Sequence, residues 1–95
     1  MVAILLSSDV KDKAVYSKNM IMLGKVKDLE FDPAQMKVTH FVVEFEKEVA
    51  KDLLGKIIVI RHAKGRVSTQ LIESIKDAII LKYPTSQLKG SIESL

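Results

Sequence analysis

The sequence contains no cysteine in its 95 residues, which excludes disulfides, thiolate zinc sites, iron–sulfur ligation and cysteine nucleophiles. Its four glycines stand singly, so the glycine-rich loops that cradle phosphates are absent. No apolar run approaches the ~20 residues needed to span a bilayer. The apolar stretch Val2 to Leu6 lacks the basic start and the length of a signal peptide. We therefore expect a cytoplasmic protein without direct membrane insertion.

The composition is that of a folded domain. Hydrophobic residues make up 47% of the chain and charged residues 28%. A chain of this length buries only roughly 60–68% of its unfolded surface, which leaves little room for an enclosed substrate cavity. No linker-like stretch or internal repeat divides the chain. We expect a single domain over residues 1–95, with its core at about residues 10–90.

The charge pattern disfavours nucleic acid as a partner. The net charge is +3 and the two signs are interspersed, whereas nucleic-acid binders usually concentrate positive charge on one face. The one basic cluster, Arg61, His62, Lys64 and Arg66, is expected at a hairpin tip with Gly65 in the turn. No aromatic residue beside it could stack on bases. The alternative is that the cluster simply solubilises a loop.

Apolar segments with strand-like alternation predict a mainly β fold. Strands are expected at residues 13–17, 21–31 and 37–46, with turn chemistry at 18–19 and 32–35. Gly24 interrupts the second strand, where glycine often marks a bulge or bend. In the third strand the predicted core face is Thr39, Phe41, Val43 and Phe45, and the outer face is Val38, His40, Val42, Glu44 and Glu46.

Short helical segments complete the predicted fold. Residues 47–54 have helical spacing. Ser68 or Thr69 could cap a short helical turn that carries Leu71, Ile72 and Ile75. Pro84 ends the last strand, and residues 85–88 form a final turn. Long bent strands with short helical turns indicate a small β-barrel.

Two apolar strands supply the argument for a protein partner. Residues 57–60 and 78–81 do not alternate, so both faces of each strand should be covered. A barrel interior covers only one face, and the other needs a helix, a loop or a second chain. The candidate interface is therefore made of the outward residues Ile58, Ile60, Ile80, Val42 and His40.

The residues that could carry chemistry do not form a recognisable site. The two histidines, His40 and His62, lack the local spacing of metal ligands, and no Gly-x-Ser-x-Gly elbow occurs. Asp28, Glu30 and Asp32 could share one strand face, although the lysines between them favour a solvated charged surface. We predict no catalytic, cofactor-binding or metal-binding residues, and no cofactor.

Several short motifs follow one another in a family-like order. They are VKDK at 10–13, VYS at 15–17, LGKVKD at 23–28, FDP at 31–33, KVT at 37–39 leading into FVVE at 41–44, and LIESIKDAIIL at 71–81. In content and order they resemble the PRC-barrel family, the domain shared by the photosynthetic reaction-centre H subunit and the ribosome-maturation factor RimM. Asp12 and Met20 stand where the family pattern has glycine, so the first turns are expected to differ in shape.

Length and Lys/Ile-rich composition are similar to those of stand-alone archaeal PRC-barrel proteins. Some of these are cell-division factors that associate with SepF, the membrane anchor of FtsZ. The resemblance implies a non-enzymatic dimeric adaptor that pairs with itself or a PRC-barrel paralogue and is recruited to the division site. The alternative is a ribosome-maturation or RNA-associated factor acting through Arg61, Lys64 and Arg66. A ligand-binding barrel or an enzyme has the least support, because no convergent polar groups are visible.

Overall fold

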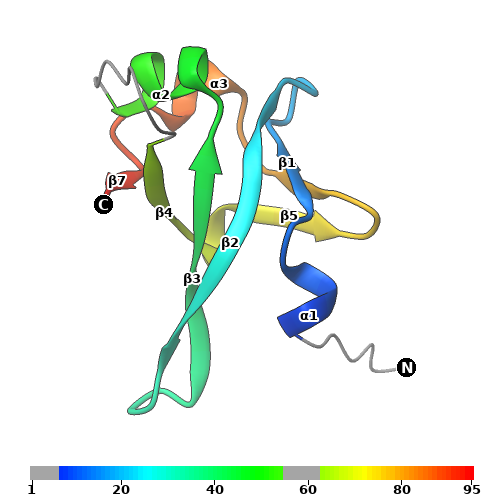
Figure 1. Ribbon diagram of the computed structural model, residues 1–95, viewed down its shortest axis with the longest axis vertical. Helices are drawn as coiled ribbons and strands as arrows, with labels where there is room; N and C mark the ends of the chain where they lie inside the picture. The colour runs from blue at the N-terminus through cyan, green and yellow to red at the C-terminus, as the bar shows by residue number, and fades with distance from the viewer. Residues whose placement is uncertain (1–6, 55–62) are drawn as a thin grey trace.

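The computed structural model describes residues 7–54 and 63–95. Its elements are α1 (Ser7–Val10), β1 (Ala14–Tyr16), β2 (Met22–Asp32), β3 (Lys37–Phe45), α2 (Lys47–Leu54), β4 (Lys64–Ser68), the 3-10 helix η1 (Thr69–Leu71), β5 (Ile72–Ile75), β6 (Ile79–Leu81), α3 (Thr85–Leu88) and β7 (Glu93–Ser94). Within these residues the strands form one seven-stranded sheet in the order β5-β6-β1-β2-β3-β4-β7. The predicted mainly β, barrel-like fold with short helices is confirmed (Figure 1).

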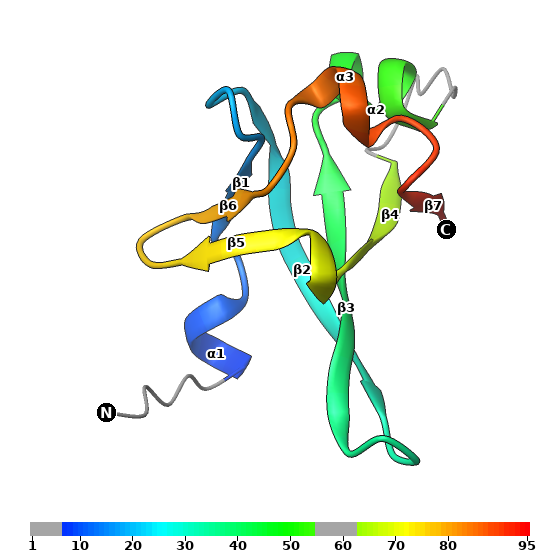
Figure 2. The ribbon, with the colours of Figure 1, turned by 180° about the vertical axis from the view of Figure 1, so that it is seen from behind.

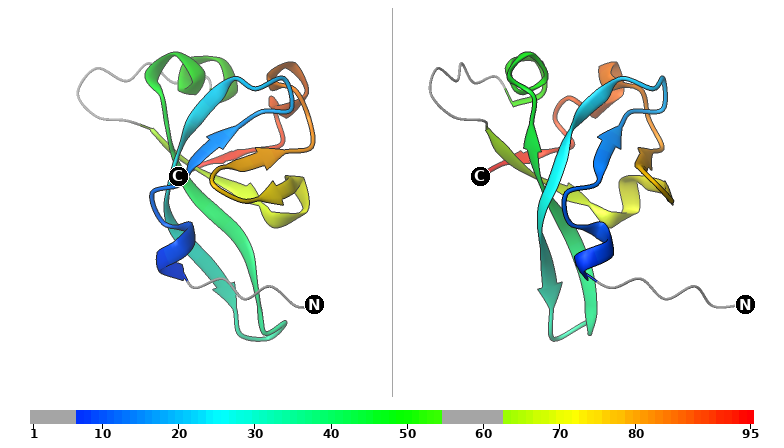
Figure 3. Two further views of the ribbon diagram at one scale, coloured as in Figure 1. Left: turned by 90° about the vertical axis from the view of Figure 1, so that its right-hand side faces the viewer. Right: turned by 45° about the vertical axis from the view of Figure 1, so that its right-hand side comes forward.

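The sheet is strongly curled, and its first and sixth strands lie side by side although they are far apart in the sequence. β1 pairs parallel with β6, and all other neighbours pair antiparallel. Figure 2, seen from behind, shows β5 and β6 crossing in front of the long β2–β3 hairpin, and Figure 3 shows the sheet curling from the side. The buried apolar side chains of these strands form one core cluster inside the curl. α2 and α3 lie over one end of this half-barrel, and the β2–β3 turn extends from the other (Figure 1).

The interior follows the alternation expected from the sequence. Phe41, Val43 and Phe45 of β3 are buried, and Thr39 at the start of the predicted core face is half-buried. The other large, fully buried apolar side chains come from four further strands, β1, β2, β4 and β6, and from α3: Val15, Leu23, Val26, Val67, Ile79, Leu81 and Leu88. The helix predicted at 47–54 is α2, and it buries Ala50 against this core.

Gly24 is required by the close approach of two backbones. A Cβ at this position would collide with the carbonyl oxygen of Glu44 and lie 2.8 Å from Phe45 Cα. The β1–β2 register also slips here, because Val15 pairs with Gly24 whereas Tyr16 pairs with Met22. The expected irregularity at Gly24 is therefore confirmed as a slip of the β1–β2 register, and the close approach of β3 leaves no room for a side chain at this position.

The predicted helical turn near residue 70 is correct only in its first part. Ser68 Oγ accepts a hydrogen bond from Gln70 N (3.2 Å) and caps η1, as expected. Ile72 and Ile75 do not continue the helix but form β5, which pairs with β6. Pairing offers both residues backbone partners and contact with the core, and this outweighs the weak local preference for a helix.

Two early turns keep a glycine-like backbone without glycine. Asp12 has a φ of 68° and Met20 a φ of 63°, both in the left-handed region. The Met20 amide donates to Ser17 O (2.9 Å) and the Asp12 amide to Val26 O (2.8 Å). These turns therefore adopt the conformation that glycine favours, contrary to the expectation that its absence would reshape them.

Candidate interaction surfaces

An apolar row runs across the outer face of three neighbouring strands. Ile80 of β6 pairs with Tyr16 of β1, and Tyr16 pairs with Met22 of β2. All three side chains are half-buried, whereas Ile79 and Val15 beside them point into the core. Alternate residues of a strand face opposite sides of the sheet, so the three share the outer face. We call Tyr16, Met22 and Ile80 the outer apolar row.

The sequence-predicted interface residues do not all lie together. Ile80 belongs to the outer apolar row, whereas His40 and Val42 lie on β3, with β1 and β2 between them and β6. Val42 pairs with Asp28 on one side and Arg66 on the other, so charged residues flank it. The remaining two candidates, Ile58 and Ile60, fall outside the described residues.

The outer face of β2, β3 and β4 is an alternating charged surface. Its cross-strand rows are Lys25–Glu44–Lys64, Asp28–Val42–Arg66 and Glu30–His40–Ser68. His40 Nδ1 lies 3.0 Å from Thr39 Oγ1 and 3.8 Å from Glu30 Oε1. This histidine is a half-buried surface residue beside a carboxylate, as its outward position in the sequence pattern predicted.

Arg66 joins three strands through its guanidinium. Its Nε donates to Glu30 Oε1 of β2 (2.6 Å), and its Nη1 donates to Glu93 Oε2 of β7 (2.7 Å). The hydrogen bond to Glu30 is the main reason that the pKa of Arg66 is raised above its usual value. A guanidinium held by two carboxylates is partly neutralised, so it offers less attraction to a phosphate than an unpaired one.

The described part of the basic cluster is not a hairpin tip. Lys64, Gly65 and Arg66 lie within β4, which pairs with β3 on one side and β7 on the other. Gly65 faces inward, where a Cβ would lie 2.8 Å from Cε2 of Phe45. A side chain here would crowd the Phe45 ring, so the glycine that suggested a turn is explained by close packing within a strand. Arg61, also predicted for the cluster, falls outside the described residues together with His62.

The three carboxylates of β2 bind different partners and do not converge on one site. Asp28 and Glu30 lie on the same outer face, opposite Val42 and His40, whereas Asp32 follows the register irregularity after Glu30. Asp28 Oδ1 accepts from Leu29 N (2.8 Å), Glu30 binds Arg66, and Asp32 accepts hydrogen bonds in the following turn. Over residues 7–54 and 63–95 no group of three or more His, Asp or Glu is arranged to hold a metal ion.

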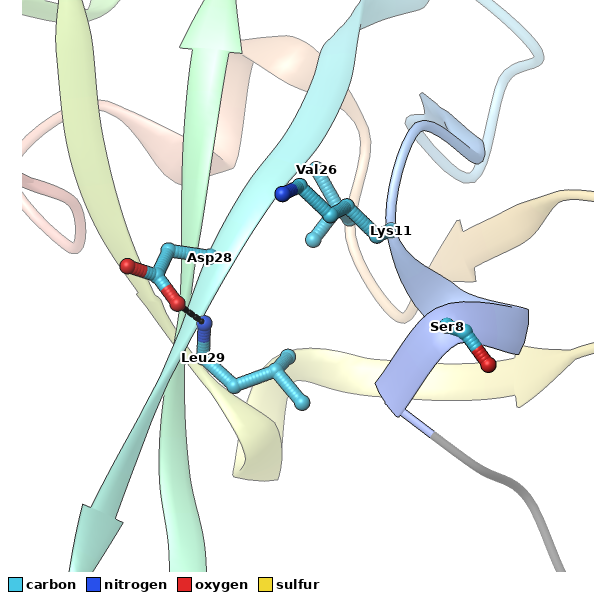
Figure 4. A pocket seen from close by; sticks show the side chains of 5 residues that line it. All are labelled: Ser8, Lys11, Val26, Asp28 and Leu29. Carbon is cyan, nitrogen blue, oxygen red and sulfur yellow. Dashed lines mark hydrogen bonds between the residues drawn. The ribbon is translucent and has the colours of Figure 1, made fainter.

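A hollow of about 270 Å³ lies between α1 and β2. Ser8, Lys11, Val26, Asp28 and Leu29 line it (Figure 4). Asp28 directs its carboxylate to the amide of Leu29, and Figure 4 shows Asp28 and Ser8 on opposite sides of the β2 ribbon. Because its polar groups do not converge on one point, this hollow lacks the arrangement that orients a small substrate.

Two further surfaces were not predicted from the sequence. The β2–β3 turn exposes Phe31 (55%) and Met36 (75%). At the opposite end a hollow of about 430 Å³ lies between the start of β2 and α2. It is lined by Ile21, Met22, Glu46, Lys47, Glu48 and Val49. For the first of these surfaces the sequence did contain a signal. Phe31 and Met36 flank the Asp-Pro turn at residues 32–35, and apolar side chains at the end of a hairpin cannot reach the core.

A strongly curled sheet of short strands with small helices over one end defines a small β-barrel module. The family model for the PRC-barrel domain matches residues 4–88. The chain therefore belongs to the PRC-barrel family, which confirms the resemblance seen in the sequence. A search of the curated proteins finds no match. PRC-barrel domains are generally non-catalytic modules. Among the described helices, none has the length and apolar character to span a bilayer.

Proposed function

We propose that this protein is a non-enzymatic adaptor that binds other proteins through the outer apolar row, with itself or a PRC-barrel paralogue as the partner. The observation that carries the proposal is the alignment of Ile80, Tyr16 and Met22 across three adjacent strands of the outer face. The neighbouring outer face of β2, β3 and β4 is charged. An apolar stripe beside a charged rim is the usual arrangement of a protein–protein contact.

The electrostatics of the described residues also support binding rather than catalysis. The groups whose pKa values shift are Asp12, Lys27 and Arg66, and each belongs to an ion pair on the surface. In enzymes, shifted titratable groups usually gather in a cleft where they exchange protons with a substrate. Here the ion pairs of Arg66 connect strands, and the Asp12–Lys27 pair connects the turn before β1 to β2, which favours a structural role.

The more specific proposal concerns cell division. The length and composition are similar to those of stand-alone archaeal PRC-barrel proteins that associate with SepF. On this proposal the adaptor would be recruited from the cytoplasm to the division site by a SepF-type partner. The alternative RNA-associated role is weakened because Arg66, one of its three proposed contacts, is already paired with Glu30 and Glu93.

Substitution of Ile80 tests the proposal. Ile80→Asp places a charge in the outer apolar row and should lower self-association, measured by sedimentation velocity at micromolar concentrations, and binding to purified SepF, measured calorimetrically. Val42→Asp is the matched control, since Val42 is also half-buried but lies among charged residues. The proposal is wrong if Ile80→Asp changes neither measurement while the variant remains folded.

A further inference from the structure

The β2–β3 turn carries two apolar side chains away from the body of the molecule. The hairpin extends along the longest dimension of the described chain, which measures 41 Å, and its turn lies at one end (Figure 1). Phe31 is 55% exposed and Met36 is 75% exposed, one on each side of the turn. We call Phe31 and Met36 the hairpin tip. The core covers neither side chain, because the β2–β3 hairpin extends beyond it at this end.

The turn that holds the tip is well ordered by its own hydrogen bonds. Asp32 Oδ1 accepts from the amides of Ala34 (2.9 Å) and Gln35 (3.4 Å). Gln35 Nε2 donates to Asp32 Oδ2 (3.0 Å), and Pro33 restricts its own φ. A surface that is ordered before binding loses little conformational entropy on association. The tip is therefore a preformed apolar projection.

An apolar groove lies at the other end of the molecule. It is the hollow of about 430 Å³ between the start of β2 and α2. Ile21, which is 44% exposed, and the half-buried Met22 and Val49 supply its apolar lining. Its charged members are Glu46, Lys47 and Glu48, which give it one net negative charge. Figure 1 shows α2 and the start of β2 at the end opposite to the β2–β3 turn.

The tip and the groove are complementary in charge as well as in polarity. Lys37 follows Met36 directly and is exposed, and among the described residues it forms no ion pair. Glu46 and Glu48 on the groove are exposed carboxylates that could receive it. An apolar pair flanked by a lysine is therefore complementary to an apolar hollow flanked by carboxylates.

We propose that the hairpin tip of one copy of this chain binds the α2 groove of the next copy. The two surfaces differ and lie at opposite ends, so the contact is heterologous: each copy added leaves one tip and one groove free, and the contact can repeat. This association shares only Met22 with the outer apolar row. It does not depend on the proposed adaptor function.

Complementary variants test this arrangement directly. All proteins carry Ile80→Asp, so that the outer apolar row does not contribute. Phe31→Asp removes the tip and Ile21→Asp removes the groove, and both side chains are exposed, so the fold should survive, as checked by amide NMR spectra. Each variant alone should associate at least about tenfold more weakly than the Ile80→Asp parent, since a buried apolar contact is lost.

The mixture of the two variants gives the decisive result. The Ile21→Asp protein keeps its tip and the Phe31→Asp protein keeps its groove, so the mixture should form one-to-one dimers and nothing larger in sedimentation experiments. The proposal is overturned if the mixture associates no more than either variant alone. It is also overturned if either variant alone associates as strongly as the parent.

A spin label locates the contact. Because the chain has no cysteine, Ala34→Cys carries a nitroxide at the tip alone. Mixed with ¹⁵N-labelled parent protein at high concentration, it should broaden the amide signals of Ile21, Met22 and Val49. The broadening should disappear when the ¹⁵N-labelled protein carries Ile21→Asp. Broadening confined to residues 31–37, which would mean a tip-to-tip contact, or no broadening at all, would contradict the proposal.

Discussion

Arg66 on β4 donates a 2.6 Å hydrogen bond to Glu30 on β2, across the intervening strand β3. The two residues are 36 positions apart in the sequence. His40 of β3 pairs directly with Glu30, and its Nδ1 lies 3.8 Å from the same Glu30 oxygen. This bridge ties three strands of the outer face together, and the Arg66 bond to Glu93 adds the C-terminal strand β7.

The bridge predicts different effects for two basic residues of the same strand. Arg66→Ala should lower the melting temperature, because Glu30 and Glu93 lose their common partner. Lys64→Ala is the matched control: Lys64 lies two residues away on the same face and is exposed, so its removal should leave the melting temperature nearly unchanged. Equal melting temperatures for the two variants would show that the bridge contributes nothing to stability.

The Asp12–Lys27 pair (3.0 Å) predicts a pH dependence. The hydrogen bond and charge of Lys27 lower the pKa of Asp12 below its ordinary value of 3.8. The pair therefore stabilises the fold above pH 3.8, and this contribution is lost as pH falls through the lowered pKa, when the folded state must also take up the proton. Thermal melts of the unmodified protein and of Lys27→Gln should differ at pH 7 and converge below pH 3.8. A difference independent of pH would exclude this ion pair as its source.

Met20 predicts a stabilising substitution. Its φ of 63° is unfavourable for a residue with a Cβ, whereas glycine adopts it readily. Glycine relieves this strain but also increases the entropy of the unfolded state, which offsets part of the gain. The net effect of Met20→Gly should be a free energy of unfolding higher by roughly 0.5 kcal/mol, which corresponds to a melting temperature higher by about 2–4 °C. Met20→Ala retains the Cβ and should bring no such gain. The explanation by backbone strain fails if alanine stabilises as much as glycine.

Replacement by alanine should destabilise the fold by different amounts at Gly24 and at Gly90. Gly24→Ala would force a Cβ into the backbone of β3 and should destabilise the fold by at least about 3 kcal/mol, because main chain cannot move aside as a side chain can. Gly90 has a φ of 87° but open space around it, so Gly90→Ala should cost about 1 kcal/mol of backbone strain alone. Urea unfolding curves separate the two. Similar midpoints would show that the β2–β3 approach is not as tight as described.

The sequence by itself determined the features that depend on neighbours along the chain. Alternation in residues 37–45 assigns a core face, the Asp-Pro turn closes the hairpin, and the spacing in 47–54 defines α2. Each rests on side-chain periodicity or on hydrogen bonds over a few residues. For the same reason the family resemblance was visible, since its motifs are mainly turn and core positions.

Only the tertiary structure decided the features that join distant segments. Ile72 and Ile75 form a strand instead of a helical turn because β6 supplies hydrogen-bond partners. Arg66 lies in a strand instead of a hairpin tip because β3 and β7 pair with β4 on its two sides. The outer apolar row likewise requires β6 to lie beside β1, far away in sequence. Such pairings depend on the sum of many packing contacts, which no local pattern records.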